Sequence, residues 1–346
     1  MPSLYDPSVL AIAADVMVRD FMVVKPGEQV VITADLATDP AAISAIGHAA
    51  RVQGAKLSVI QIPQLPYQGS LADPYVPEPA AAAVSNCDVW FDLTFPYMGG
   101  SAAHQAAMDT GRVRSLLIAD LGGDGIARLF GKVSFDKLFA VQSAFDKLIA
   151  DSVGEECHVS CPAGSDFTFT IGKPATQKLR HTNRPGTYTP PGSAAIYPDP
   201  KTVRGEVVIR GTFHEYHTKL DEPIRLTVDG QIREVTGGGS ERAVLERALK
   251  RAAGGKYGSI IHLTQGFHPA ARFTGKSFME DIRTCGANAI GFGIPWWEEG
   301  GGENHPDGVT MEQSMTIGGV PIVRAGEIVG PGELVRLAAE LEVLHA

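Results

Sequence analysis

Long apolar runs, an excess of positive charge and a disulfide framework are all missing from this sequence, and each absence excludes a class of protein. No apolar run approaches the roughly 20 residues that span a bilayer, so no membrane partner is expected. The formal net charge is −9 and no basic stripe is present, which argues against a nucleic-acid partner. Residues 1–6 have neither the basic start nor the apolar core of a signal peptide, so we expect a cytoplasmic protein.

Nucleotide and zinc motifs are also missing. No Gly-x-Gly-x-x-Gly follows the first expected strand, and the glycine-rich stretch 122–125 lacks the Lys-Ser/Thr of a phosphate loop, so we interpret it as a turn. The four cysteines give no disulfide framework in a chain this long. Cys157 and Cys161 are spaced like half of a zinc site, but no second cysteine pair exists and the segment alternates like a strand.

The first half of the chain alternates between helical and extended patterns. With 44% apolar and 20% charged residues, the 346-residue chain has the composition of a globular protein and the length for two domains. Helices are expected at 9–22, 40–53, 71–84 (interrupted by proline) and 102–110, and strands at 30–34, 56–62, 89–93 and 115–119. Strands separated by helices predict a parallel sheet, hence an α/β domain over residues 1–150.

The second half has a different pattern, of short alternating strands. They are expected at 158–161, 166–171, 205–211, 224–228 and 231–235, with a helix at 241–253. Asp229-Gly230 predicts a type I′ hairpin turn, and Gly318-Gly319 predicts another hairpin. Residues 151–346 are therefore expected to form a mainly antiparallel, β-rich α+β domain with one or two helices.

One stretch of this second half carries candidate metal ligands. His305 and Asp307 are two residues apart, so in an extended backbone both side chains point to the same face. His262 lies at the end of the apolar run 259–263, a predicted buried strand. Two histidines and one carboxylate suit a mononuclear non-haem Fe(II) centre or a catalytic zinc. The alternative is a loop aspartate that orients a loop histidine, with no metal.

Five segments in the second half resemble landmarks of the thermophilic metallo-aminopeptidases (aminopeptidase S and T). In chain order they are PAGSDF (162–167), RGEVVI (204–209), QGFHPAAR (265–272), AIGFG (289–293) and HPD (305–307). The first half agrees in its pattern of elements and more loosely in its residues. The resemblance implies a metal-binding second domain and a homo-oligomeric protein.

The departures from the peptidases indicate a particular branch. Those enzymes hold two metal ions with two glutamates, two histidines and an aspartate. Here the stretch for the first glutamate, 191–194, has no carboxylate, His262 replaces the second glutamate, and Asn288 replaces one histidine. Two adjacent dications need anionic ligands to offset their repulsion, so a paired site is not expected. The remaining set, His262, His305 and Asp307, is that of the sister branch, the 2,5-dihydroxypyridine 5,6-dioxygenases.

The resemblance implies an Fe(II)-dependent, extradiol-type dioxygenase that cleaves the ring of a small hydroxylated N-heteroaromatic or aromatic acid. Its partners would be that aromatic substrate and dioxygen. The first alternative is an aminopeptidase or amidase-type metallo-hydrolase that uses zinc or another divalent metal. It would need a general base, and the missing first glutamate removes the obvious one. A second alternative is a catalytically silent scaffold, which would have no reason to keep a complete ligand set.

Further residues are candidates for proton transfer and substrate binding. The catalytic candidates are His104, His214 and His217, and the substrate-binding candidates are Arg184, Tyr188, Ser193, His268 and Trp296. The dioxygenase branch has an acid/base histidine in a first-domain loop; the aligned position falls nearer Gly100 than His104. Trp296 would wall a flat ring, and Arg184 would fix a carboxylate. For each of them the alternative is a structural or solvated side chain.

Overall fold

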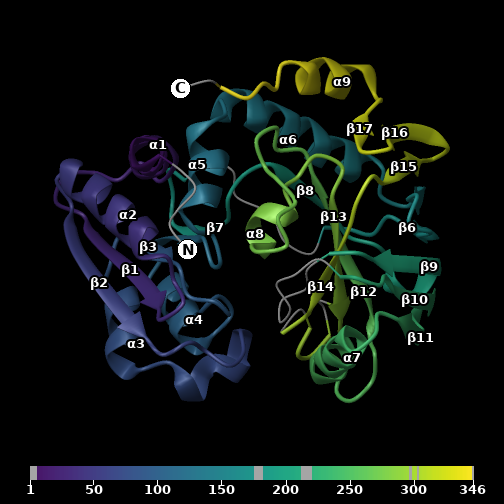
Figure 1. Ribbon diagram of the computed structural model, residues 1–346, viewed down its shortest axis with the longest axis horizontal. Helices are drawn as coiled ribbons and strands as arrows, with labels where there is room; N and C mark the ends of the chain where they lie inside the picture. Colours follow the sequence, from purple (N-terminus) through teal and green to yellow (C-terminus); the bar gives the residue numbers. More distant parts are fainter. Residues whose placement is uncertain (1–5, 175–181, 212–219, 296–297, 302–303, 345–346) are drawn as a thin grey trace. The chain divides into compact units, whose positions relative to one another are not determined.

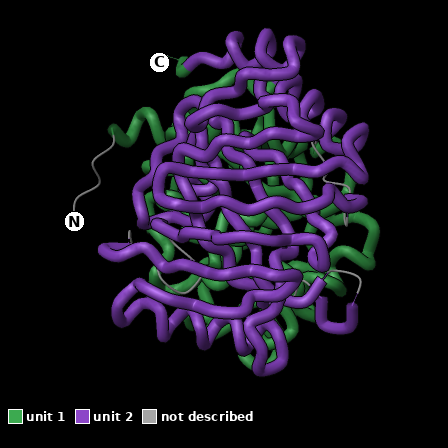
Figure 2. The backbone as a smooth tube through the Cα atoms, turned by 90° about the vertical axis from the view of Figure 1, so that its right-hand side faces the viewer, with its two compact units in different colours: residues 1–135, 178–191, 343–346 green, residues 136–177, 192–342 purple. Residues whose placement is uncertain are grey.

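The computed structural model describes residues 6–174, 182–211, 220–295, 298–301 and 304–344. The chain divides into two compact units: unit 1 is residues 1–135, 178–191 and 343–346, and unit 2 is residues 136–177 and 192–342 (Figure 2). The domain boundary expected at residue 150 stays a prediction, since these units are defined by contacts and unit 1 includes segments from three parts of the chain. None of the described helices has the length and apolar character to cross a membrane.

Unit 1 is built on a five-stranded parallel sheet with the strand order β2-β1-β3-β4-β7 (Figure 1). The strands are β1 (Gln29–Asp35), β2 (Lys56–Ile62), β3 (Val89–Asp92), β4 (Arg114–Leu117) and β7 (Gly186–Tyr188). The helices are α1 (Pro7–Val16), α2 (Pro40–Val52), α3 (Glu78–Ser85), α4 (Ala102–Asp109) and α5 (Gly123–Gly131), with a π-helical turn at Met17–Phe21 and a 3₁₀ helix at Gly69–Tyr75. This confirms the expected parallel α/β fold. Strand β7, which the sequence pattern did not predict, extends the sheet beside β4.

Carboxylates hold the loops at the carboxyl ends of the unit 1 strands. Asp39 accepts from the amide of Ala41 (2.9 Å) at the start of α2 and from that of Gly123 (2.8 Å) at the start of α5. The glycine-rich stretch that opens α5 thus has a carboxylate from its own chain at the position where a phosphate loop would hold its ligand. This arrangement fits the interpretation of residues 122–125 as a turn.

Asp92, at the end of β3, is fully buried. Its carboxylate accepts from the hydroxyls of Thr33 (2.9 Å) and Thr94 (2.6 Å) and from the amides of Thr94 (3.2 Å) and Met98 (2.8 Å). Burial raises the pKa of Asp92 to about 6, although these hydrogen bonds oppose the rise. Asp92 therefore anchors the loop that leads from β3 to α4.

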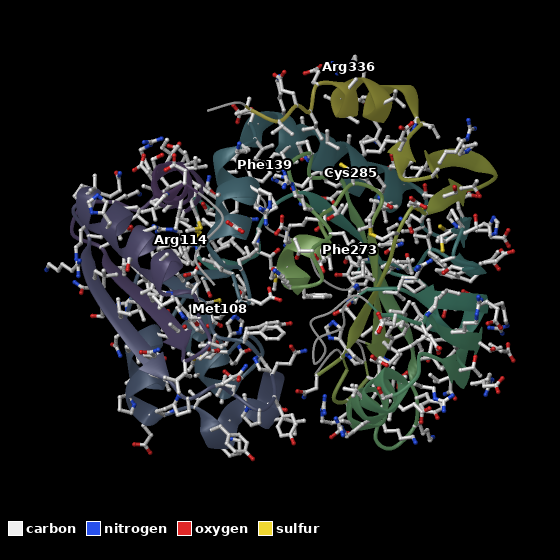
Figure 3. All side chains as sticks on the ribbon, viewed as in Figure 1. Met108, Arg114, Phe139, Phe273, Cys285 and Arg336 are labelled. Carbon is white, nitrogen blue, oxygen red and sulfur yellow. The ribbon has the colours of Figure 1, made fainter. Side chains whose placement is uncertain are left out.

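A buried arginine ties the opposite end of the sheet to the chain before β1. Arg114 begins β4 (Figure 3) and its guanidinium pairs with the Glu28 carboxylate at 2.8 and 3.1 Å. The same guanidinium donates to the carbonyls of Met22 and Val23, each at 3.3 Å. Since Arg114 is only 9% exposed, these acceptors are what make its burial tolerable.

Unit 2 contains two antiparallel sheets. The eight-stranded sheet has the order β11-β10-β9-β6-β5-β15-β16-β17, and its strands run across the view in Figure 2. They are β5 (Glu156–Ser160), β6 (Asp166–Thr170), β9 (Arg204–Ile209), β10 (Ile224–Asp229), β11 (Gln231–Gly237), β15 (Ser314–Ile317), β16 (Val320–Arg324) and β17 (Glu327–Ile328). The four-stranded sheet, β14-β13-β12-β8, comprises β8 (Ser193–Ile196), β12 (Ser259–Gly266), β13 (Asn288–Gly293) and β14 (Asp307–Thr310). The mainly antiparallel second half is confirmed.

Two details of unit 2 differ from the sequence-based expectations. Its helices are α6 (Phe135–Asp151, which starts in unit 1), α7 (Glu241–Ala252), α8 (Phe278–Asp281) and α9 (Gly332–Ala339), more than the one or two expected. The β10–β11 hairpin forms, but the type I′ prediction is wrong because only Gly230 has a positive φ (67°). Asp229 stays in the strand, where Arg204 Nε contacts its carboxylate at 2.5 Å. The hairpin at Gly318-Gly319 is confirmed.

The raised pKa of Asp92 makes a prediction about stability. The folded state binds this proton more tightly than the unfolded chain does, so Asp92 reduces the free energy of unfolding as pH rises from about 4 to about 6. Between about pH 5 and pH 7 we expect the wild type to lose about 1.4 kcal/mol relative to Asp92→Asn, measured by urea unfolding. The exposed Asp136→Asn is the control. A difference between wild type and Asp92→Asn that does not vary with pH would contradict the assignment.

Candidate metal centre

Three neighbouring strands of unit 2 bring the candidate ligands together. In the strand register, His262 of β12 is opposite Gly291 of β13, and Gly291 is opposite Asp307 of β14. A β-bulge in β12 inserts Ile261 between the pairs made by Ile260 and His262, which places His262 rather than Ile261 across from Gly291. His262 lies within β12, which continues to Gly266, and not at its end as the sequence suggested.

The ligand atoms of the three residues lie close to one another. His262 Nε2 is 3.1 Å from His305 Nε2 and 3.0 Å from Asp307 Oδ1, and His305 Nε2 is 3.4 Å from Asp307 Oδ2. The side chains are 12% exposed for each histidine and 4% for the aspartate, so the cluster is nearly buried yet still accessible. It is a group of histidine and carboxylate ligands able to hold one ion. The structure therefore brings together the three residues predicted from the sequence, although His262 and the 305–307 stretch are about 40 residues apart in the chain.

These distances fit a single metal ion. At bonds of about 2.0–2.2 Å, adjacent ligand atoms around one ion are separated by about 3.0 Å in octahedral and about 3.4 Å in tetrahedral geometry. The three measured separations, 3.0, 3.1 and 3.4 Å, lie in this range. Two imidazoles and one carboxylate also suit a divalent cation chemically, because they supply two neutral nitrogens and one negative charge.

The backbone around the cluster fixes the ligands. The amide of Phe292 donates to the carbonyl of Pro306 at 2.9 Å, which secures the stretch between His305 and Asp307 against β13. His262 Nδ1 faces the Thr264 hydroxyl at 3.4 Å, a residue on the same face of β12. Such a partner orients the imidazole and leaves Nε2 directed at the other ligands. Sequence reasoning missed Thr264, although its i+2 spacing from His262 was a usable signal.

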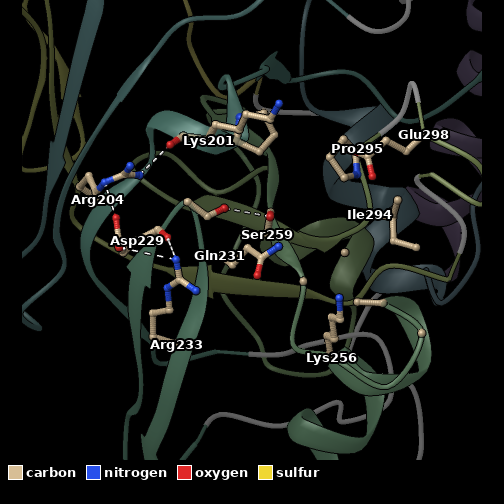
Figure 4. A pocket seen from close by; sticks show the side chains of 16 residues that line it. Lys201, Arg204, Asp229, Gln231, Arg233, Lys256, Ser259, Ile294, Pro295 and Glu298 are labelled. Atoms are coloured by element: carbon tan, nitrogen blue, oxygen red, sulfur yellow. Dashed lines mark hydrogen bonds and ion pairs between the residues drawn. The ribbon is translucent and has the colours of Figure 1, made fainter.

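A charged cleft of about 670 Å³ opens beside the starting end of β12 (Figure 4). Its lining includes Ser259, Gly293 and the cations Lys201, Arg204 and Lys256, but none of the three ligands. A Cβ at Gly293 would lie 3.4 Å from His305 Cβ, so the cleft reaches the backbone next to the cluster. The cleft and the metal cluster are therefore adjacent and distinct.

Two of the predicted substrate-binding residues, Ser193 and His268, lie near the end of β12 that is far from the cleft. Ser193 pairs with Gly266, four residues after His262, which is about 13 Å along β12. His268 is fully buried, accepts from the amide of Ala270 at Nδ1 (3.2 Å) and packs directly on Gly192, beside Ser193. At that separation from His262, neither is a ligand of the ion, and their role toward a substrate stays a prediction.

The remaining predicted residues are in unit 1 or outside the described residues. Tyr188 is buried, its hydroxyl donates to the carbonyl of Arg184 (2.6 Å), and burial raises its pKa. The Arg184 residue is exposed. Three further predicted residues lie outside the described residues: His214, His217 and Trp296. Their roles stay predictions.

His104 has hydrogen bonds at both ring nitrogens. Nδ1 accepts from the Gly100 amide (3.3 Å), and Nε2 lies 2.8 Å from the Thr187 hydroxyl, which itself donates to Met108 Sδ (3.2 Å). The Thr187 oxygen is thus free to accept, so the ring carries its proton on Nε2. Burial lowers the pKa of His104, which favours the neutral ring.

This arrangement predicts the state of His104 in solution. Nitrogen NMR should find a neutral ring that is protonated at Nε2, with a pKa below the ordinary histidine value of about 6.5. Because the folded pKa is lowered, His104 should reduce stability only as the pH falls below that value. Thr187→Val should disturb the Nε2 signal, and a His104 pKa at or above the ordinary value would contradict the structure.

The cluster predicts metal binding by the wild type. Asp307→Ala removes the only negative ligand, so the variant should lose its bound metal ion while it keeps its fold, as measured by metal analysis and circular dichroism. Asp229→Ala, a carboxylate in the adjacent cleft, is the matched control and should keep the metal. Full metal content in Asp307→Ala would count against this site.

Comparisons with known proteins agree with this geometry. Among solved structures, 2,5-dihydroxypyridine dioxygenase from Pseudomonas putida KT2440 is similar with a TM-score of 0.75 and 20% identity, over 95% of this chain and 99% of that one. AmpT from Thermus thermophilus is similar with a TM-score of 0.62 and 17% identity, over 93% and 99%. At these identities the two structures establish the shared fold. No curated protein sequence matches the chain. The model of the 2,5-dihydroxypyridine 5,6-dioxygenase family matches residues 19–330, and the chain therefore belongs to that family.

Proposed function

We propose that the protein is a mononuclear non-haem Fe(II) dioxygenase that cleaves the ring of a small hydroxylated N-heteroaromatic or aromatic acid similar to 2,5-dihydroxypyridine. The observation that carries the proposal is the convergence of His262, His305 and Asp307 within 3.0 to 3.4 Å, in a chain that belongs to a ring-cleaving dioxygenase family. Three protein ligands leave coordination positions for a substrate and dioxygen.

The choice of iron follows from the reaction. Bound Fe(II) would supply the redox chemistry that lets dioxygen react with an aromatic ring, and zinc has none. The chain's own residues would hold and orient: His262 and His305 as neutral donors, and Asp307 as the single negative charge. The strand register positions His262 and Asp307, and the hydrogen bond from the Phe292 amide to the Pro306 carbonyl holds the stretch that carries His305. The three side chains would therefore be in place before a substrate arrives.

A metallo-hydrolase is the alternative from another class. It would use zinc and would require a base close to the metal-bound water. The ligand cluster offers its only carboxylate, Asp307, to the ion itself, and 191–194 has no acidic side chain. Among the described residues, the one group of histidine and acidic side chains placed to hold an ion has three members, whereas the paired-metal peptidases use five ligands. These observations favour the oxygenase. The homo-oligomeric state and the cytoplasmic location stay predictions.

The function is tested by oxygen consumption. Protein purified without oxygen and loaded with Fe(II) should consume dioxygen when 2,5-dihydroxypyridine or a related hydroxylated ring acid is added. The zinc-loaded protein should not, because zinc cannot change its oxidation state. Asp307→Ala in the same assay separates turnover at the site from free iron.

A metallo-hydrolase would show the opposite dependence on oxygen and on the metal. It would release product from aminoacyl substrates in strict anaerobiosis and would work with zinc. Hydrolysis under those conditions, together with no oxygen uptake for any hydroxylated ring acid, would overturn the proposal.

A further inference from the structure

We propose that Gly291 is a positioning residue of the metal centre: the absence of a side chain at this position allows the His262 imidazole to cross β13 and reach Asp307. The significance for metal binding rests on the function proposed above. The steric relation between Gly291 and His262 rests on the structure alone.

The register makes a crossing necessary. His262 is in β12 and Asp307 is in β14, and both flank Gly291 in the strand between them. Neighbouring strands are about 4.8 Å apart, so the two ligand backbones are separated by about 9.6 Å. Yet His262 Nε2 lies 3.0 Å from Asp307 Oδ1. The imidazole therefore spans the middle strand at Gly291.

The space over Gly291 is filled by the imidazole itself. A Cβ at this position would lie 2.2 Å from His262 Nε2, 2.4 Å from Cδ2 and 2.9 Å from Cε1. Real Cβ atoms essentially never approach other atoms this closely, so the ring would have to leave its place. The clash involves the ligand nitrogen and its two neighbouring ring carbons, which means that relief is possible only by moving the ligand.

The requirement at Gly291 is for space and not for a special backbone conformation. Gly291 is not among the glycines with a positive φ, so its backbone suits any L-residue. Gly293, on the same face of β13, differs: a Cβ there would meet His305 Cβ at 3.4 Å, an ordinary contact. On the other side, Thr264 limits where the displaced ring can go, because its hydroxyl lies 3.4 Å from His262 Nδ1. Of the two glycines, only Gly291 leaves room for a ligand atom.

The first experiment measures Co²⁺ binding, with the ion's visible spectrum as the signal. Gly291→Ala should weaken Co²⁺ binding by about 10- to 100-fold or more, as supporting residues of metal sites do when they are replaced. Gly332→Ala is the matched control: its Cβ meets nothing within 4 Å and its backbone is unstrained. It should bind as the wild type does. Unchanged affinity in Gly291→Ala would overturn the inference.

The second experiment uses the metal-free protein and a double-mutant cycle. Gly291→Ala should lower the Tm when His262 is present, and should lower it little or not at all in a His262→Ala background, because the ring that the new Cβ meets is gone. If Gly291→Ala fails to fold, recovery of folding in the double variant supports the inference in the same way. An equal loss in both backgrounds, or no folding in either, would contradict it.

The two readouts separate this inference from the proposed function. If the wild type binds no Co²⁺, the proposed metal centre is wrong, while the cycle on the metal-free protein still decides whether Gly291 makes room for His262. If the wild type binds Co²⁺ and the cycle shows no coupling between the two positions, the metal centre stands and the positioning role of Gly291 fails.

Discussion

The burial of one carboxylate between two imidazoles is the constraint on which the four-stranded sheet of unit 2 depends. Asp307 is 4% exposed, and a carboxylate removed from water is stable only if donors or a cation replace the lost hydration. A divalent ion shared with His262 and His305 would supply that compensation. The three side chains meet because β12, β13 and β14 are adjacent and because the bulge at Ile261 places His262 opposite Gly291, which is itself opposite Asp307. The register of this sheet therefore serves the polar cluster as well as the packing of the apolar core.

Unit 1 uses its carboxylates differently. Asp39 and Asp92 lie near the carboxyl ends of parallel strands, where α/β proteins commonly bind ligands, but each accepts hydrogen bonds from loops or helix ends of its own chain. His104 is held at both ring nitrogens in the same way. These groups act as fixed anchors of the loops in unit 1. A residue with fixed hydrogen bonds is a poor proton carrier unless a substrate replaces one of its partners.

Much of the fold could be predicted from periodicity, and the clustering of the three candidate ligands from chemistry. The strand at 30–34 and the helix at 241–253 match β1 and α7 closely, because their apolar spacing reflects burial directly. The strand at 56–62 matches β2, although most of its residues are exposed or only partly buried. Strand β7 was missed because it has only three residues. The turn at Asp229 was misassigned because Asp229 pairs with Gln231 and with Arg204 in the sheet, which leaves Gly230 alone in the turn. Gly291 gave no signal of its own, since its requirement arises from two other strands.

The face of the sheet opposite His262 carries an uncharged hydrogen-bond network. In the peptidases that the sequence resembles, a histidine ligand stands where this chain has Asn288. Here the Asn288 side chain accepts from the Thr264 amide at 3.0 Å and donates to Gln313 Oε1 at 2.5 Å, and the Gln313 amide in turn donates to Gln265. All three amides are fully buried. Asn288 is opposite Gln265, three residues from His262, so it faces the other side of the sheet. Its hydrogen bonds are used within this uncharged network, so Asn288 stands in the position of the peptidase histidine without adding a ligand to the cluster.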